Sequence, residues 1–235
     1  VSDRPIKWVY NGEQIEGQNY PDLSKAIVTN LEGDGDFRSD ECLEVLKKCD
    51  IVVTNPPFSL FREFVDTINE YKKDFLIIGS KNAITYKEFF PLLRDNKAWL
   101  GYNVSNGTMY FVQEDLTEKG VPSFWYTTLE HDKRNEEIIL FKKYNETDYP
   151  YFDNYNAINI DKVKDIPCNY KGWMGVPITF MNKYNPKQFE IFGIMNTGEE
   201  NVGIRLPNTP HGRPVVKGKE KYLRILVRNR KPQLD

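Results

Sequence analysis

Cysteine and histidine are scarce in this chain of 235 residues. The three cysteines, Cys42, Cys49 and Cys168, form no Cys-x-x-Cys pair, and the two histidines, His131 and His211, stand far apart. A disulfide framework needs paired cysteines, and a structural zinc site needs clustered cysteine or histidine ligands. The composition therefore predicts neither a disulfide framework nor a metal, and it suits a reducing, cytoplasmic location.

Long apolar runs and a large net charge are also missing. No stretch of about eighteen uncharged apolar residues occurs, and the first residues lack the basic and apolar regions of a signal peptide, so we expect no membrane contact. The 32 basic residues oppose 34 acidic ones, for a formal net charge of −2. The segment 217–231 is the exception, because it carries seven Lys or Arg and only Glu220 as an acid. Such a cluster suits either a surface for nucleic-acid phosphates or a solvated face.

The first half of the chain alternates short β-rich runs with amphipathic segments, which is typical of strands joined by helical crossovers. The apolar run Ile51–Val53 predicts a strand that is buried on both faces. Ser39 is expected to cap one helix, and Thr85 with Glu88 is expected to form a capping box for another. The expected helices are 39–48, 59–73 and 85–96, and the expected strands are 26–31, 51–53, 75–80, 97–103, 123–129 and 137–144.

The composition changes after Tyr144. Residues 145–167 are rich in Asn, Asp, Tyr and Pro and show no periodicity, so they are interpreted as a linker or irregular segment. Two later runs, 176–195 and 221–230, look like β-structure. We therefore predict an α/β fold with two domains, residues 1–150 and a smaller β-rich region at 151–235.

The sequence Asn55-Pro56-Pro57-Phe58 follows the apolar run, where an open α/β sheet places its ligands. An exocyclic aromatic amine is a poor nucleophile because its lone pair is delocalised into the ring. Two acceptors that each take one N–H would favour a tetrahedral nitrogen. The Asn55 side chain and the Pro56 carbonyl are candidates, and the prolines restrict the backbone that holds them. The alternative is a turn that only ends a buried strand.

Phe58 is a candidate for stacking on a base that has been extruded from a duplex, which would offset part of the cost of unstacking. Trp125, Tyr170 and Trp173 are weaker candidates for the same role, because aromatic residues are more often part of the core. No general base is needed beside the motif, since the amine proton becomes acidic only after the methyl group has arrived. The absence of a nearby histidine is therefore compatible with methyl transfer.

The motif with its surroundings, GDGDFRSDECLEVLKKCDIVVTNPPFSLFREFV, resembles the EcoRI-type adenine-specific DNA methyltransferase family. The resemblance continues through IIGSKNAITYKEFFPLL and MGVPITFMNKYNPKQFEIFGI to the basic end of the chain. It implies a Rossmann-like class I methyltransferase sheet. It also implies transfer of a methyl group from S-adenosyl-L-methionine to adenine N6 in double-stranded DNA, as in restriction-modification systems.

The resemblance assigns cofactor contacts to Asp36 and Phe37, in addition to Asn55. Asp36 would accept a hydrogen bond from the cofactor's amino group, and Phe37 would contact its adenine ring; the alternative is an acidic turn that caps the next helix. The glycine-rich loop of the family is not found, since Gly33 and Gly35 give only Gly-x-Gly and lie beside acids. We therefore expect a partial sheet without its first strand, which alone binds the cofactor weakly and is inactive.

Residues 151–235 are assigned to DNA target recognition by family order and by the basic cluster, with phosphate contacts from Lys217, Lys219, Lys221, Arg224, Arg228 and Arg230. No base code can be read there, because phosphate contacts carry no base identity. Two other functions stay open: RNA guanine-N2 or protein glutamine methylation, whose substrate amines present the same two hydrogens, and a non-catalytic DNA-binding remnant.

Overall fold

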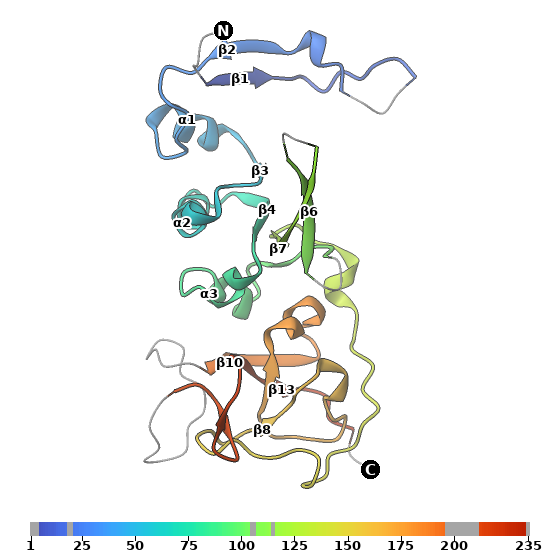
Figure 1. The fold of residues 1–235 in the computed structure, drawn as a ribbon. Coiled ribbons are helices and arrows are strands. Elements are labelled where there is room, and N and C mark those ends of the chain that lie inside the picture. Colours follow the sequence, from blue (N-terminus) through green and yellow to red (C-terminus); the bar gives the residue numbers. More distant parts are fainter. Residues whose placement is uncertain (1–4, 18–20, 104–106, 114–115, 196–211, 234–235) are drawn as a thin grey trace.

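The computed structural model describes residues 5–17, 21–103, 107–113, 116–195 and 212–233. They form an N-terminal β-ribbon, a central sheet with helices along one side, and a lower lobe built on a second sheet (Figure 1). The α-helices of this described part are α1 (Asp40–Lys48), α2 (Phe61–Glu70) and α3 (Phe90–Arg94). Its 3-10 helices are η1 (Leu23–Lys25), η2 (Phe58–Leu60), η3 (Lys81–Thr85), η4 (Asp132–Asn135), η5 (Val163–Asp165) and η6 (Ile178–Lys183).

The central sheet has the strand order β3-β4-β7-β5, with β6 paired to β7. The neighbours β3 and β4 are parallel, whereas β7 runs antiparallel between β4 and β5. The bounds are β3 (Ile51–Thr54), β4 (Asp74–Ser80), β5 (Trp99–Leu100), β6 (Thr108–Val112) and β7 (Glu118–Thr127). The structure thus confirms an α/β arrangement in the first half, built on a mixed sheet.

Helix α2 covers one face of this sheet. It buries Phe61, Val65 and Ile68, and the Phe61 ring packs edge-on against Tyr126 of β7 at a centroid distance of 5.9 Å. The opposite face is open at β3, where Ile51 and Val53 are 46% and 64% exposed. The expectation that β3 is buried on both faces is therefore wrong, because β3 is an edge strand within the described residues.

The predicted capping of α1 is confirmed, and the predicted capping box is wrong. The Ser39 side chain accepts a hydrogen bond from the Cys42 backbone at 3.3 Å, and α1 begins at the next residue. Thr85 instead ends η3, where its hydroxyl donates to the Asn82 carbonyl at 2.8 Å. The helix that was expected from Thr85 begins only at Phe90, with Pro91 in its first turn.

Two expected strands of the central sheet lie elsewhere or do not form. Residues Ile27–Asn30 form β2, but β2 pairs only with β1 (Ile6–Val9) in the separate N-terminal ribbon. Residues 137–144 form no strand, apart from one isolated bridge between Lys142 and Pro167. This segment is held by side chains instead, since the Gln188 amide hydrogen-bonds both backbone groups of Ile138 at 2.8 Å.

The lower lobe contains a second sheet in the order β10-β13-β9-β8, beside the small hairpin β11-β12. Its strands are β8 (Ile158–Asn159), β9 (Met174–Pro177), β10 (Phe189–Met195), β11 (Val215–Val216), β12 (Lys219–Glu220) and β13 (Arg224–Asn229). These positions confirm β-structure in the run 221–230 and at both ends of the run 176–195, whose middle forms η6 instead. One cluster of buried apolar residues runs from α2 and β4 into β9, β10 and β13, so the two lobes share a core.

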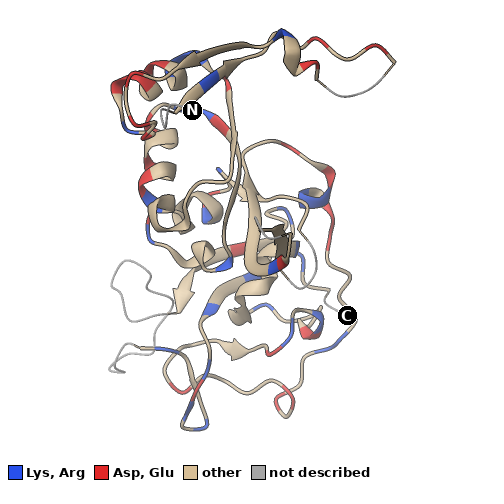
Figure 2. Ribbon diagram, turned by 45° about the horizontal axis from the view of Figure 1, so that its top comes forward, with Lys and Arg blue, Asp and Glu red and all other residues tan. Residues whose placement is uncertain are grey.

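Charged residues are unevenly distributed over the molecule. Figure 2 shows acidic residues gathered around α1 and the turn before it, while basic residues are more frequent in the lower lobe. None of the helices in the described part is long and apolar enough to span a membrane. No group of histidine, cysteine or carboxylate side chains there has the arrangement of a metal site.

Candidate active site

The Asn55–Phe58 loop connects the carboxyl end of β3 to α2. Strand β3 ends at Thr54, and Pro57, with φ −55° and ψ 126°, leads into η2. The Leu60 backbone N–H donates to the Pro57 carbonyl at 3.0 Å, which closes the first turn before α2. Both prolines thus lie in a short, tightly bonded connection whose backbone has little freedom.

The two predicted acceptors of this loop have no partner within the described part of the chain. Asn55 is exposed, and its side chain makes no hydrogen bond to another described residue. Pro56 is buried, and its carbonyl likewise receives no hydrogen bond there. The Pro56 carbonyl is therefore available to an external donor. Phe58 is half-buried at the start of η2.

A second loop carries Asp36 and Phe37 to the first turn of α2. Arg38 binds the Asp36 carboxylate through Nε at 2.9 Å and Nη2 at 2.7 Å, and it reaches Glu63 in α2 at 2.7 Å. The Phe37 ring packs edge-on against Phe64 with a centroid distance of 5.0 Å. Since α2 begins directly after the Asn55–Phe58 loop, the helix brings the two predicted sites to the same end of the sheet.

Hydrogen bonds from Arg38 keep Asp36 ionised. The guanidinium and the Arg38 backbone N–H both donate to this carboxylate and lower its pKa to about 2. The same contact raises the pKa of Arg38. Two carboxylate oxygens offer about four acceptor positions. Three N–H groups of Arg38 donate to the Asp36 carboxylate and occupy three of these positions. One position is left for a further N–H donor.

The six predicted DNA contacts fall in two structural settings. Lys217 and Lys219 are exposed on the β11-β12 hairpin, and the backbone N–H groups of Lys217 and Gly218 anchor its turn to Asp153. The other four are Lys221, Arg224, Arg228 and Arg230, which all bind protein groups.

Arg224 is the clearest departure from the expected phosphate surface. Its side chain is buried, and it contacts Asp161 at 3.1 Å and Asn159 at 3.4 Å. Arg228 is exposed but pairs with Glu190 at 2.6 Å and lies over the Trp173 ring. Because Arg224 faces the protein interior, we leave it out of any DNA surface proposed below.

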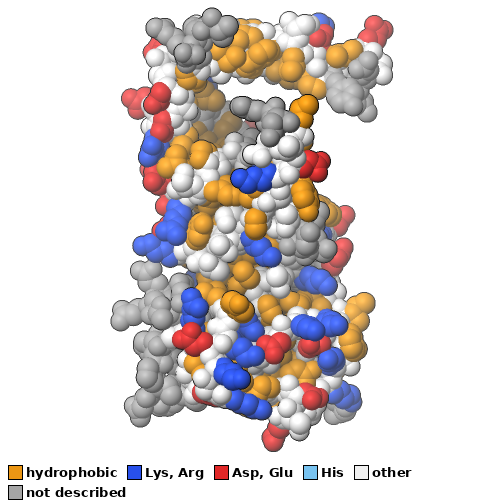
Figure 3. Space-filling view, viewed as in Figure 1, with side chains coloured by type: hydrophobic (Ala, Val, Ile, Leu, Met, Phe, Trp, Pro, Cys, Tyr) orange, Lys and Arg blue, Asp and Glu red, His pale blue; other side chains and the backbone are white. Residues whose placement is uncertain are grey.

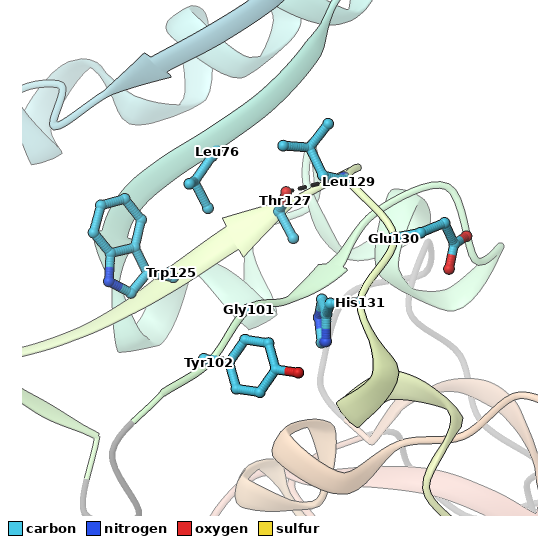
Figure 4. A pocket seen from close by; sticks show the side chains of 8 residues that line it. All are labelled: Leu76, Gly101, Tyr102, Trp125, Thr127, Leu129, Glu130 and His131. Carbon is cyan, nitrogen blue, oxygen red and sulfur yellow. Dashed lines mark hydrogen bonds between the residues drawn. The ribbon is translucent and has the colours of Figure 1, made fainter. Parts of the chain in front are cut away.

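A pocket of about 280 Å³ opens on the uncovered face of the central sheet (Figure 4). Trp125, Tyr102 and His131 surround it, and its walls are mainly apolar. His131 is half-buried there, with Nε2 2.9 Å from the Leu100 carbonyl oxygen. The pocket holds neither a nucleophile beside a base nor a pair of carboxylates, so it offers no evident chemistry.

The comparisons with known proteins agree with the motif. The family described as adenine-specific methyltransferase EcoRI matches residues 2–230. The type II methyltransferase M.EcoRI of Escherichia coli is 42% identical over 95% of this chain and 70% of its own length. M.MgeORF184P of Mycoplasma genitalium is 39% identical (88% of this chain, 73% of its own length), and M.MpnI of Mycoplasma pneumoniae is 37% identical (85% and 70%).

No solved structure matches the chain. The family match covers nearly the whole sequence, including both loops beside the first turn of α2 and the strand β13 with its arginines. The chain therefore belongs to the EcoRI-type family of adenine-specific methyltransferases.

Proposed function

We propose that this protein transfers a methyl group from S-adenosyl-L-methionine to the N6 amine of adenine in double-stranded DNA, with the base flipped out to the Asn55–Phe58 loop. The observation that supports this most directly is the pair of unpartnered oxygens on Asn55 and Pro56, at the carboxyl end of β3. Membership of a family of type II methyltransferases supports the choice of DNA as substrate.

The loop contributes hydrogen-bond acceptors rather than a base. The Asn55 side-chain oxygen and the Pro56 carbonyl would each accept one N–H of the amine, which moves the nitrogen toward a tetrahedral geometry and frees its lone pair. The short connection through Pro57 and η2 holds both oxygens without reorganisation when charge develops on the nitrogen. Phe58 would stack on the flipped base and offset part of the unstacking cost.

The loop that carries Asp36 and Phe37 fits the adenosine part of the cofactor. Asp36 keeps one acceptor position free, and its low pKa keeps it charged at neutral pH. Phe37 is half-buried and held by Phe64, so its ring is fixed beside that carboxylate. When bound, the cofactor would supply an electrophilic methyl group, which attracts the amine lone pair exposed by Asn55 and Pro56.

Two alternatives make different demands on the same loop. RNA guanine-N2 and protein glutamine amines also present two N–H groups, so Asn55 and Pro56 alone do not separate them from adenine. The family match favours adenine. A non-catalytic DNA-binding remnant would bind DNA through residues 151–235 without any need for two free acceptors beside β3.

Replacement of Asn55 by alanine in the full-length protein tests the proposal. Loss of one positioned acceptor should lower kcat by about a hundred- to thousandfold, while duplex binding is kept. Labelled methyl groups incorporated into DNA are counted, and the DNA is digested to nucleosides to identify the product. Asn69→Ala replaces an exposed asparagine near the C-terminal end of α2, away from the loop, so it serves as the matched control and should keep full activity. Unchanged transfer in Asn55→Ala, or a product other than N6-methyladenine, contradicts the proposal.

A further inference from the structure

We propose that a groove in the lower lobe, lined by Lys133, Lys162, Lys164 and Lys183, binds the phosphate backbone of the duplex. This inference rests on the proposed function for the choice of DNA. It concerns lysines outside the basic segment 217–231, and they come from three separate parts of the sequence. We call this surface the lysine groove.

The lysine groove consists of two adjoining cavities of about 520 Å³ and 330 Å³. Both are lined by Lys133 of η4, by Val163 and Lys164 of η5, and by Asn182 and Lys183 of η6. Because these five residues border both cavities, the two form one continuous depression between the three 3-10 helices. Figure 3 shows several Lys and Arg side chains, with acidic ones between them, on the visible face of the lower lobe.

The lysines of the groove are not neutralised by nearby acids. Within the described part of the chain, no carboxylate lies at ion-pair distance from Lys162, Lys164 or Lys183, and all three side chains are exposed. Lys133 is half-buried and donates to the Asn103 carbonyl at 3.4 Å. Four cations in one depression create a positive potential that attracts the regularly spaced phosphates of DNA.

The acids that border the groove are mostly engaged with other cations. Asp161 pairs with Arg224 at 3.1 Å and with Lys221 at 3.3 Å, and Glu137 pairs with Lys231. The arginine and lysines of the basic segment thus neutralise Asp161 and Glu137, while Glu136, which also lines the smaller cavity, has no ion pair among the described residues. The groove lysines stay available. In addition, Asn182 Oδ1 is buried without a hydrogen-bond partner among the described residues, so the protein does not satisfy every polar group of the groove.

The groove borders the same sheet that carries the candidate active site, because Asn103, one of its lining residues, follows β5. One row of paired residues crosses the sheet from Thr54 in β3 to Leu100 in β5, through β4 and β7. Asn55 follows Thr54 directly, and Asn103, which borders the groove, lies shortly after Leu100. Three strand spacings separate β3 from β5, or roughly 14 Å. At about 3.4 Å per base pair, one duplex covers this distance in about four steps, so it can touch both places.

The test measures the salt dependence of duplex binding after neutralisation of the three exposed lysines. The variant Lys162→Gln/Lys164→Gln/Lys183→Gln of the full-length protein is titrated with a fluorescent 24-base-pair DNA between low and physiological salt. The slope of log K against log salt is negative, and each lost phosphate contact should reduce its magnitude by about 0.9. We expect the slope of the triple variant to be smaller in magnitude by about 3 and its binding to be weaker by at least about tenfold.

The matched control is Lys48→Gln/Lys87→Gln/Lys97→Gln, which removes the same charge from exposed lysines that do not border the groove. Thermal unfolding verifies that both triple variants are folded. The proposal is overturned if the two triple variants bind DNA alike, or if wild type prefers duplex RNA and only RNA binding depends on the groove. Methyl transfer by Asn55→Ala is scored separately, so failure of the chemistry and failure of the groove are distinguishable.

Discussion

At the scale of single residues, Asp36 shows how one neighbour sets the charge of a predicted cofactor contact. Arg38 lowers the Asp36 pKa to about 2 through hydrogen bonds to both carboxylate oxygens. An ordinary aspartate would begin to protonate near pH 4. We predict that Asp36 stays charged through this range, so that its stabilising contact is complete above about pH 4 and is lost as the pH falls toward 2.

Carboxyl carbon NMR shifts followed against pH measure this titration. Arg38→Gln removes the guanidinium and should return the Asp36 pKa toward 3.8. Asp95, whose pKa is lowered by its own hydrogen bond from Arg94, provides an internal reference that Arg38→Gln should not move. An Asp36 pKa near 4 in the wild-type protein would show that the Arg38 contact does not persist in solution.

Residue-scale predictions from sequence succeeded where the cause is local. Ser39 caps α1 because its hydroxyl reaches an N–H only three residues away, and the position of Asn55 follows from the strand directly before it. The prediction that Arg224 is an exposed cation was wrong, because its environment depends on Asn159 and Asp161, more than sixty residues earlier in the chain. No local pattern in 217–231 signals that partner.

At the scale of elements, Gly79 decides how closely α2 approaches the central sheet. A Cβ atom on Gly79 would lie 2.9 Å from each of two Phe61 ring atoms, and the ring is buried among Phe89 and Tyr126. Gly79→Ala should therefore push α2 off β4 and lower the free energy of unfolding by about 1–3 kcal/mol. Urea denaturation of the variant and the wild type measures the difference.

Gly33→Ala is the matched control for Gly79→Ala. Gly33 is exposed, and a Cβ atom there meets nothing within 4 Å. Its free energy of unfolding should stay within about 0.5 kcal/mol of the wild type. Equal stability of the two variants would mean that Phe61 can move aside at little cost.

Element types were predicted better than their partners. The apolar run Ile51–Val53 forms a strand, but the sequence does not reveal that only β4 pairs with it among the described residues. Residues 137–144 have the composition of a strand, yet Gln188 from the lower lobe binds Ile138 where a ladder was expected. Pairing depends on distant segments, whereas strand and helix propensity is local.

At the scale of the whole molecule, the lobes are joined by contacts that no single segment encodes. Helix α3 packs against β10, and β5 packs against η6. Arg134 of η4 is buried beside this junction, with its guanidinium 3.3 Å from the Trp99 ring centroid, and burial lowers its pKa. The groove lysines could not be predicted for the same reason, since only the folded chain brings Lys133, Lys164 and Lys183 together.

The shared core leads to a prediction about unfolding. Phe180 of η6 is fully buried, packs edge-on against Phe189 of β10 at 5.1 Å, and belongs to the apolar cluster that also contains Leu100 of β5. Two lobes with one core should unfold in a single cooperative step, with equal calorimetric and van't Hoff enthalpies. Phe180→Ala should then lower the free energy of unfolding by about 3–5 kcal/mol, and it should destabilise both lobes by the same amount.

Native-state hydrogen exchange distinguishes this behaviour from independent lobes. In the wild type, the most protected amides of β4 and β13 should exchange with the same free energy of opening. In Phe180→Ala both strands should lose protection equally, although β4 makes up part of one lobe and β13 part of the other. Loss of protection confined to β13 would show that the apolar cluster does not couple the lobes. The lysine groove, which joins η4 to η5 and η6, would then lack a fixed width.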